Sequence, residues 1–165
     1  MYDILTGIRV LDVTMYAFAP SATAVLADWG ADVIKIVSPE AADPMLGTPV
    51  DALPEPLIDV KFLWEIVNRG KRSIGMDLGS ESARPVLEDL VRMADVFVCN
   101  FRPPTRKKLG IDVDDIRALN PTIIYGRATG HGDRGPERDD GGFDQTDYWA
   151  RTGMAHAASQ VAEVF

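Results

Sequence analysis

Short apolar runs alternate with longer amphipathic segments along this chain. Residues 8–13 and 32–37 are rich in Val and Ile, a pattern typical of buried strands. Residues 19–29 lie between them and repeat apolar side chains at helical spacing, with Pro20 in the first turn and Gly30 as the stop. Strand, helix and strand follow one another within about 30 residues, which is the size of a crossover unit with parallel strands.

The second half of the chain repeats this alternation. Further strands are predicted at residues 73–78, 95–99 and 122–127. Further helices are predicted at residues 82–93, 104–109 and 112–119, with helical character again from Asp144 onward. Residues 62–67 fit either a short helix or a short strand. This order of elements predicts an α/β fold with a Rossmann-like, doubly wound, mostly parallel sheet.

The predicted loops differ in composition from the elements that they join. Residues 38–58 are rich in Pro, Ala and Asp, and a loop of this length inside a compact domain usually has a function. Residues 130–142 form a charged, turn-rich segment. Residues 14–21, after the first strand, contain no glycine, so the glycine-rich fingerprint of a nicotinamide-dinucleotide site is missing. Tyr16 and Phe18 in this loop fit equally well as cleft-lining or as core residues.

Charge is distributed unevenly along the chain. The sequence has 25 Asp and Glu residues against 17 Lys and Arg, a net charge of −8 at pH 7, so net charge does not attract nucleic acid or an anionic membrane. Many of the cations nevertheless lie in two short groups that contain no acid. The first basic group is Arg69, Lys71 and Arg72, and the second is Arg102, Arg106, Lys107 and Lys108.

Each basic group adjoins one end of a predicted strand. Open parallel sheets bind ligands outside the carboxyl ends of their strands, and Arg and Lys side chains suit phosphate oxygens. The two groups together therefore predict a site for one discrete phosphorylated ligand. The alternative is that both groups are ordinary solvated surface charges.

Composition narrows the class of protein. A length of 165 residues suits one domain with a substantial core, and no apolar run approaches the ~20 residues of a membrane span. The first residues lack the features of a signal peptide. Cys99, the single cysteine, allows no internal disulfide. We therefore expect a cytoplasmic protein with a buried, inert thiol.

Candidate catalytic residues are few. His131 and His156 are far apart and have no cysteine partners, so no metal site is expected. The sequence has no Gly-x-Ser-x-Gly elbow, which leaves a hydrolase triad unsupported. His131 is expected in a turn, and Asp144 suits the N-cap of the helix that follows it. The residues alone predict an α/β domain with an anion-binding face.

A set of segments carries a resemblance to a known family. They are residues 7–14, 26–36, 68–74, 94–103, 109–110, 120–125, 142–144 and 153–154. In this order and with near-family spacing, they resemble the class III coenzyme A transferase family. That family includes formyl-CoA, carnitine-CoA and phenyllactate-CoA transferases and α-methylacyl-CoA racemase.

The resemblance implies that residues 1–165 form a truncated, CoA-binding, Rossmann-like N-terminal domain, without the family's small domain and C-terminal segment. The residues that fall on family contacts to CoA are Tyr16, Ala17, Ser38, Met76, Asn100, Phe101 and Lys108. Arg72 of the first basic group is added as a further cofactor-binding candidate. Lys108 keeps a cation at its position, whereas Ser38 replaces an arginine that some relatives place near the adenine.

In the family a single aspartate is the nucleophile and forms an aspartyl-CoA thioester. The resemblance places that aspartate beyond Phe165, so no catalytic residue is assigned within residues 1–165, and Asp144 does not take its role. The racemase branch usually has a histidine where Phe143 stands, and a phenyl ring cannot move a proton. A racemase is therefore the less favoured interpretation.

The resemblance thus predicts an enzyme that moves coenzyme A from an acyl-CoA donor to a carboxylic acid acceptor, without a metal. The full-length protein is expected to be an interlocked homodimer that binds neither nucleic acid nor membrane. Residues 1–165 alone are expected to be inactive. Two other hypotheses stay open, namely a non-catalytic truncated remnant and a subunit of a split CoA-transferase.

Overall fold

The computed structural model describes residues 3–40, 43–47 and 61–159. At its centre is a five-stranded sheet in which strands pair in the order β3-β2-β1-β4-β5, and every pairing is parallel. The strands are β1 (Arg9–Val13), β2 (Asp32–Val37), β3 (Arg72–Gly75), β4 (Val96–Cys99) and β5 (Ile124–Arg127). The predicted doubly wound parallel sheet is confirmed.

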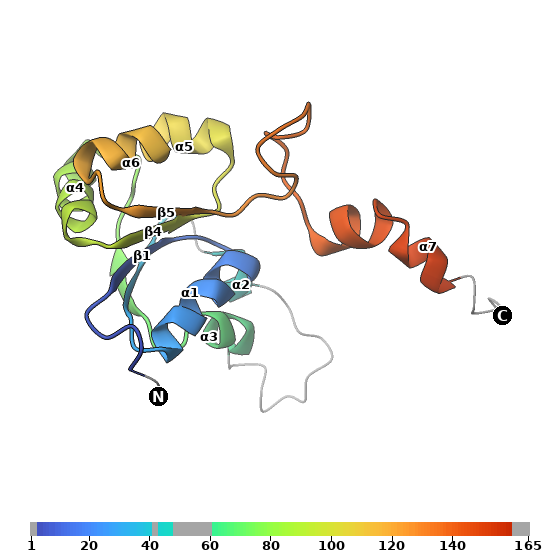
Figure 1. Ribbon diagram of the computed structural model, residues 1–165, viewed down its shortest axis with the longest axis horizontal. Helices are drawn as coiled ribbons and strands as arrows, with labels where there is room; N and C mark the ends of the chain where they lie inside the picture. The colour runs from blue at the N-terminus through green and yellow to red at the C-terminus, as the bar shows by residue number, and fades with distance from the viewer. Residues whose placement is uncertain (1–2, 41–42, 48–60, 160–165) are drawn as a thin grey trace.

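Helices cover both faces of this sheet (Figure 1). On one face lie α1 (Phe18–Asp28) and α3 (Phe62–Asn68). On the other lie α4 (Arg84–Met93), α5 (Pro103–Leu109) and α6 (Val113–Leu119). The segment that fitted either a helix or a strand is therefore helical, as α3.

Two predicted elements differ at their ends from the observed ones. The strand predicted at residues 73–78 is β3, which ends at Gly75 because it is an edge strand with β2 as its single neighbour. The helix predicted at residues 82–93 begins as a short 3₁₀ turn, η2 (Glu81–Ala83), before α4. Pro85 occupies the first turn of α4, where its missing N–H costs no hydrogen bond.

The long loop predicted at residues 38–58 contains a short helix, α2 (Pro44–Gly47). Within this predicted loop, residues 41–42 and 48–58 lie outside the described part of the chain. The described part of the loop matters because Asp43, immediately before α2, is buried against the residues that follow β1.

Successive residues of each strand face opposite helical layers. The layer with α4, α5 and α6 packs on an apolar core that includes Leu11, Val13, Ile34, Ile36, Leu87, Val91, Phe97, Cys99, Ile111 and Ile116. The layer with α1 and α3 packs on a smaller apolar cluster of Val10, Ala27, Ala31 and Val33. Next to that smaller cluster, Asp12 and Lys35 are both buried. The two faces of one sheet are therefore chemically different.

The chain beyond β5 leaves these layers. A π-helical segment, η3 (Asp144–Ala150), and α7 (Met154–Ser159) extend away from the sheet (Figure 1), so the predicted helical character from Asp144 onward is confirmed. This extension exposes large apolar side chains, which are Phe143, Tyr148, Trp149 and Met154. The ring of Phe143 meets that of Tyr16 edge to face, with centroids 5.5 Å apart.

Candidate functional site

The carboxyl edge of the sheet has a natural binding position between β1 and β4. The two strands are neighbours at the centre of the sheet, and the chain order runs outward from them in both directions. Such a reversal of strand order leaves a crevice outside the carboxyl ends, where open α/β sheets bind their ligands. The residues that follow these strands, 14–17 after β1 and 100–102 after β4, therefore define the candidate site.

A side-chain amide joins the two loops of this candidate site. The Asn100 Nδ2 donates to the carbonyl oxygen of Met15 at 2.7 Å, and the Asn100 Oδ1 accepts from the Met15 N–H at 3.0 Å. The backbone N–H and C=O of Met15, in the loop after β1, are thus both hydrogen-bonded by the Asn100 side chain, in the loop after β4. This pairing holds the loops at a set separation.

Most of the residues predicted to bind CoA lie along this edge. Tyr16 and Ala17 follow β1, and Phe101 follows Asn100 after β4. Ser38 and Met76 are the residues directly after β2 and β3. The structure therefore brings these sequence-predicted residues to one edge of the sheet.

The second basic group divides into exposed and buried members. Arg102, Lys107 and Lys108 are exposed on or beside α5. Arg106 is buried instead, where its Nη1 donates to the Phe101 carbonyl oxygen at 2.7 Å and its Nε to Asp112 Oδ1 at 3.0 Å. Arg106 thus braces the loop after β4, and the exposed cations are the ones placed to meet an anion.

The first basic group does not face the candidate site, so the prediction that both groups meet one ligand is wrong. Arg72 is the first residue of β3, at the opposite, amino edge of the sheet. Its guanidinium binds Asp32 through Nε at 2.8 Å and Nη2 at 2.7 Å, and Arg9 binds the same carboxylate at 3.0 Å. Arg69 pairs with Asp28. The first group lies at the start of its strand, whereas the second follows the end of its own.

These two guanidiniums also set the ionisation of Asp32. Partial burial raises the pKa of Asp32. The hydrogen bonds and positive charges of Arg72 and Arg9 together lower it by more than burial raises it, so the pKa of Asp32 is below its ordinary value. The amino edge is therefore held by internal ion pairs.

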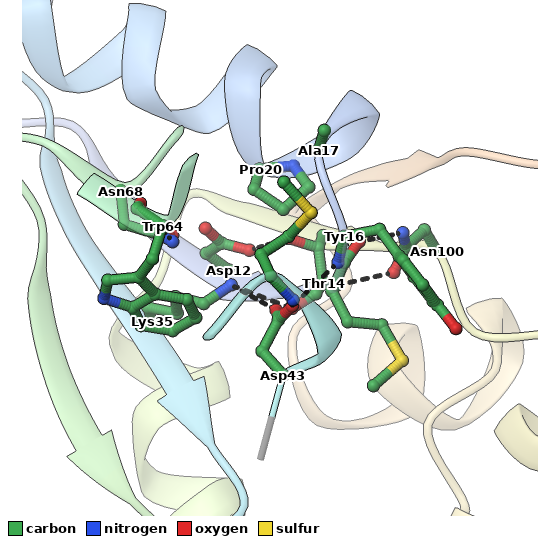
Figure 2. A network of polar contacts seen from close by, with 12 residues as sticks. Asp12, Thr14, Tyr16, Ala17, Pro20, Lys35, Asp43, Trp64, Asn68 and Asn100 are labelled. Atoms are coloured by element: carbon green, nitrogen blue, oxygen red, sulfur yellow. Dashed lines mark hydrogen bonds and ion pairs between the residues drawn. The ribbon is translucent and has the colours of Figure 1, made fainter. Parts of the chain in front are cut away.

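The remaining member of the first basic group, Lys71, enters a buried polar network that the sequence did not predict. Figure 2 shows Asp12, Thr14 and Lys35 of this network. Lys71 Nζ lies 2.7 Å from Asp12 Oδ2, and it also donates to the Pro20 carbonyl oxygen at 2.8 Å. Asp12, which is completely buried, further accepts from the hydroxyls of Thr23 and Thr14. One carboxylate thus joins β1, α1 and the segment before β3.

Lys35 forms the second half of this network. Its Nζ donates to the Thr14 carbonyl oxygen at 2.9 Å, lies 3.9 Å from Asp43 Oδ2, and sits 5.3 Å from the centre of the Trp64 ring. Burial lowers the pKa of Lys35, while Asp12 and Asp43 raise it, and the net shift is downward. The signal available in the sequence was a pair of charged residues, Asp12 and Lys35, inside otherwise apolar strands.

One nucleophilic side chain, the thiol of Cys99, lies at this edge. Cys99, at the end of β4, is buried as predicted, and burial raises its pKa to about 11, so the thiol is protonated at neutral pH. Within residues 3–40, 43–47 and 61–159, no cluster of His, Cys, Asp and Glu side chains could hold a metal ion.

The helices of the described residues are all too short or too polar to cross a bilayer.

Comparison with known proteins gives the family. The profile of CoA-transferase family III matches residues 5–163. The chain is 32% identical over 154 residues to the cinnamoyl-CoA:phenyllactate CoA-transferase of Clostridium sporogenes, an alignment that covers 93% of this chain and 37% of that protein. It is 41% identical over 140 residues to the formyl-CoA:oxalate CoA-transferase of Streptomyces avermitilis, which covers 84% of this chain and 32% of that protein. The chain thus spans about a third of the length of these curated relatives.

A solved structure agrees with these sequence matches. A CaiB/BaiF family protein from Brucella suis superimposes with a TM-score of 0.76 and 35% sequence identity, over 88% of this chain and 38% of that one. Sequence and fold therefore point the same way, and the chain belongs to family III of the CoA-transferases.

Proposed function

We propose that this chain forms the CoA-binding part of an enzyme that moves coenzyme A from an acyl-CoA to a free carboxylic acid. The observation that carries the proposal is the family membership of a chain whose predicted CoA contacts gather at the switch point between β1 and β4. A CoA thioester needs a nucleotide-binding edge of this kind, and it needs cations near its phosphates.

In the proposed arrangement CoA lies along the carboxyl edge. Tyr16 and Ala17 contact it from the loop after β1, and Asn100 and Phe101 border it from the loop after β4. Lys108 is exposed on α5 and offers a positive charge to a phosphate. These residues bind and orient the cofactor, and no proton transfer is assigned to any of them.

Two further contacts lie beside this central set. Met76 follows β3 and is 6% exposed within the apolar core, so only a small part of its side chain is available to contact the nucleotide. Ser38 follows β2 and offers only a hydroxyl at a position where a cation would bind a phosphate more strongly. Arg72 is not part of the proposed site, because it lies at the amino edge and is already paired with Asp32.

The proposed chemistry uses an aspartate supplied beyond Phe165. Its carboxylate attacks the thioester carbonyl and expels the CoA thiolate, which leaves a mixed anhydride. The thiolate then attacks the aspartyl carbonyl, releases the donor acid and forms an aspartyl-CoA thioester. The acceptor carboxylate repeats the two steps in reverse, takes the CoA and frees the aspartate.

The same proposal includes acyl-CoA and carboxylic acids as substrates and an interlocked homodimer as the full-length assembly. Phe143 supports transfer over racemisation, because its ring has no group that can remove or return a proton. Phe143 is more than half exposed and touches Tyr16, so it lies beside the proposed CoA position.

The test is a transfer assay with the protein in full length. The protein is mixed with a panel of acyl-CoA donors and free acids, and new acyl-CoA species are measured by mass spectrometry, while CoA binding is measured by calorimetry. We expect binding together with exchange between at least one donor and one acid. Absence of both would disprove the proposal, and binding without exchange would favour a non-catalytic chain.

A further inference from the structure

Asp43, which is not among the predicted CoA-binding residues, is buried and hydrogen-bonded to the backbone of one of them, Tyr16. It lies in the segment before α2, is 5% exposed, and its Oδ1 accepts from the backbone N–H of Tyr16 at 3.2 Å and from that of Met45 at 3.0 Å. Its Oδ2 is buried without a hydrogen-bond partner within the described residues. A buried carboxylate without full hydrogen bonding is costly, so its place here calls for a reason other than stability.

The backbone that Asp43 holds is strained. Tyr16 has φ = 66°, and it is the one non-glycine residue with positive φ in the described part of the chain. Bulky side chains rarely adopt this conformation, and residues held in such regions gather at ligand-binding positions. The hydrogen bond from the Tyr16 N–H to Asp43 therefore stabilises a conformation that the chain does not favour by itself.

Two side chains bind the loop after β1, one from each of the strands that flank β1 in the sheet, β2 and β4. Asn100, after β4, binds both backbone groups of Met15. Asp43, after β2, binds the next residue along the chain, Tyr16. The loop after β1 thus has one clamp on either side, and Figure 2 shows both clamps meeting at the same turn.

Asp43 is held in turn by Lys35. The Lys35 Nζ, 2% exposed in its side chain, lies 3.9 Å from Asp43 Oδ2 and donates to the Thr14 carbonyl oxygen at 2.9 Å. The Lys35 ammonium group therefore attracts the Asp43 carboxylate and also binds Thr14, the first residue of the loop after β1. The pair is continuous with Asp12 and Lys71, so the buried network ends at the candidate site.

We propose that Asp43, anchored by Lys35, is a positioning residue that sets the loop after β1 in its CoA-binding conformation. The inference rests on the proposed function and adds to it a residue outside the predicted contact set. Asp43 does not touch the ligand in this account. It acts by keeping the Tyr16 backbone in the left-handed conformation before CoA arrives.

The expected consequence is a population effect. When a binding-competent loop is only partly populated, the apparent dissociation constant rises by the inverse of that fraction. Loss of one hydrogen bond of ordinary strength changes such a population by about tenfold. The variant Asp43→Ala is therefore expected to weaken CoA binding by about tenfold.

The first measurement needs no ligand. Backbone amide hydrogen exchange is followed in the full-length protein and in Asp43→Ala. We expect the Tyr16 amide to exchange about tenfold faster in the variant, while the Phe97 amide in β4 stays protected. The Met15 amide, which Asn100 holds, serves as an internal comparison and is expected to change less than that of Tyr16.

The second measurement is CoA affinity by calorimetry, together with steady-state kinetics. Asp43→Ala is expected to raise the KM for the acyl-CoA donor while leaving the KM for the acid acceptor unchanged. Asp43→Asn keeps an oxygen that can accept from Tyr16, so its effects are expected to be smaller. Asp114→Asn removes an exposed carboxylate from α6 and is the matched control, with unchanged affinity.

The outcomes separate this inference from the proposed function. If the unmodified protein does not bind CoA, the proposed function fails, and with it the role of Asp43 in CoA binding. If it binds CoA but Asp43→Ala changes neither Tyr16 exchange nor affinity, only the positioning role is overturned. Equal acceleration at Phe97 would show a general loss of stability and would also overturn it. Should Asp43→Ala not fold, the same criteria apply to Asp43→Asn.

Discussion

The two faces of the sheet are built from the same strands but from different chemistry. Leu11 and Ile34 enter an apolar core under α4 and α6, whereas the next residues, Asp12 and Lys35, enter a network of charges under α1 and α3. Apolar burial stabilises a fold roughly in proportion to its area. Buried ion pairs add little net stability, because desolvation offsets their attraction.

The two faces of the sheet therefore have different structural roles. The apolar face holds the layers together. On the charged face, the four charged side chains of the network each contact Thr14, Pro20 or Tyr16, which lie in the segment between β1 and the first turn of α1. These side chains are Asp12, Lys35, Asp43 and Lys71. The buried charges therefore add little to the stability of the fold, but they fix the positions of the loops that surround the candidate site.

The largest effect is expected from Asp12→Ala on the charged face. The substitution leaves Lys71 and Lys35 without the carboxylate between them, and an uncompensated buried charge costs about 3–5 kcal/mol. The free energy of unfolding in urea measures the loss.

The matching control is the double variant Asp12→Leu with Lys71→Met. It removes both charges of the closest pair, and apolar replacement of a buried pair is often tolerated. It should therefore recover much of the stability lost by Asp12→Ala. A loss below about 1 kcal/mol for Asp12→Ala would contradict the buried-charge explanation.

A comparable loss is expected on the apolar face from Leu87→Ala, with a different effect on the site. Leu87 of α4 is 2% exposed, so truncation leaves a cavity and costs about 3 kcal/mol. The Tyr16 amide should keep its protection from exchange, and CoA affinity should change much less than in Asp43→Ala, because the side chains that hold the loop after β1, Asp43 and Asn100, are not part of this apolar cluster.

The neighbouring Val86 provides the control for that prediction. It is 44% exposed on the same helix, and Val86→Ala should alter stability by no more than about 0.5 kcal/mol. If Leu87→Ala weakens CoA binding as strongly as Asp43→Ala does, the division of tasks between the faces is wrong.

A smaller loss is expected from Arg106→Met, which sharpens the comparison at the second basic group. The variant leaves the Phe101 carbonyl oxygen and Asp112 without their charged donor, and hydrogen bonds to charged groups contribute about 1.5–3 kcal/mol. Thermal unfolding and exchange of amides near residues 100–102 measure the effect. The exposed Arg102→Met is the control, and equal losses in both variants would argue against the bracing role of Arg106.

The smallest effect is expected at the amino edge of the sheet, where the ion pairs of Asp32 should stabilise the fold less as the pH falls. The pKa of Asp32 is lower in the folded protein than its ordinary value, so the pairs with Arg72 and Arg9 stabilise above about pH 4. That contribution is lost as pH falls through the folded pKa. Because these side chains are partly exposed, it amounts to less than about 1 kcal/mol.

Urea unfolding of the unmodified protein and of Asp32→Asn at several pH values tests this point. The difference between the two should shrink toward zero as the pH falls from 7 to about 2. A difference that is independent of pH would show that the ion pairs do not contribute.

The sequence by itself determined the order and type of the elements. The central strands β1, β2 and β4 are runs rich in Val or Ile, whereas the edge strands β3 and β5 have one Ile each. The amphipathic segments between them repeat at helical spacing, so local patterns were sufficient for the parallel α/β fold. They also placed Tyr16, Asn100 and Phe101 directly after strands, which is where a parallel sheet binds ligands. The ends of β3 and α4 shifted by a few residues, because edge pairing and a 3₁₀ turn depend on neighbours.

Only the tertiary structure decided what the charges do. In the sequence, Arg72 and Lys108 both look like free cations beside strands, yet the parallel sheet puts Arg72 at the edge opposite the candidate site and next to Asp32. Asp43 and Tyr16 are 27 residues apart in the chain and become hydrogen-bonded through folding. A charge is attracted or neutralised by whatever lies within a few ångströms of it, and such distances exist only once the layers have packed.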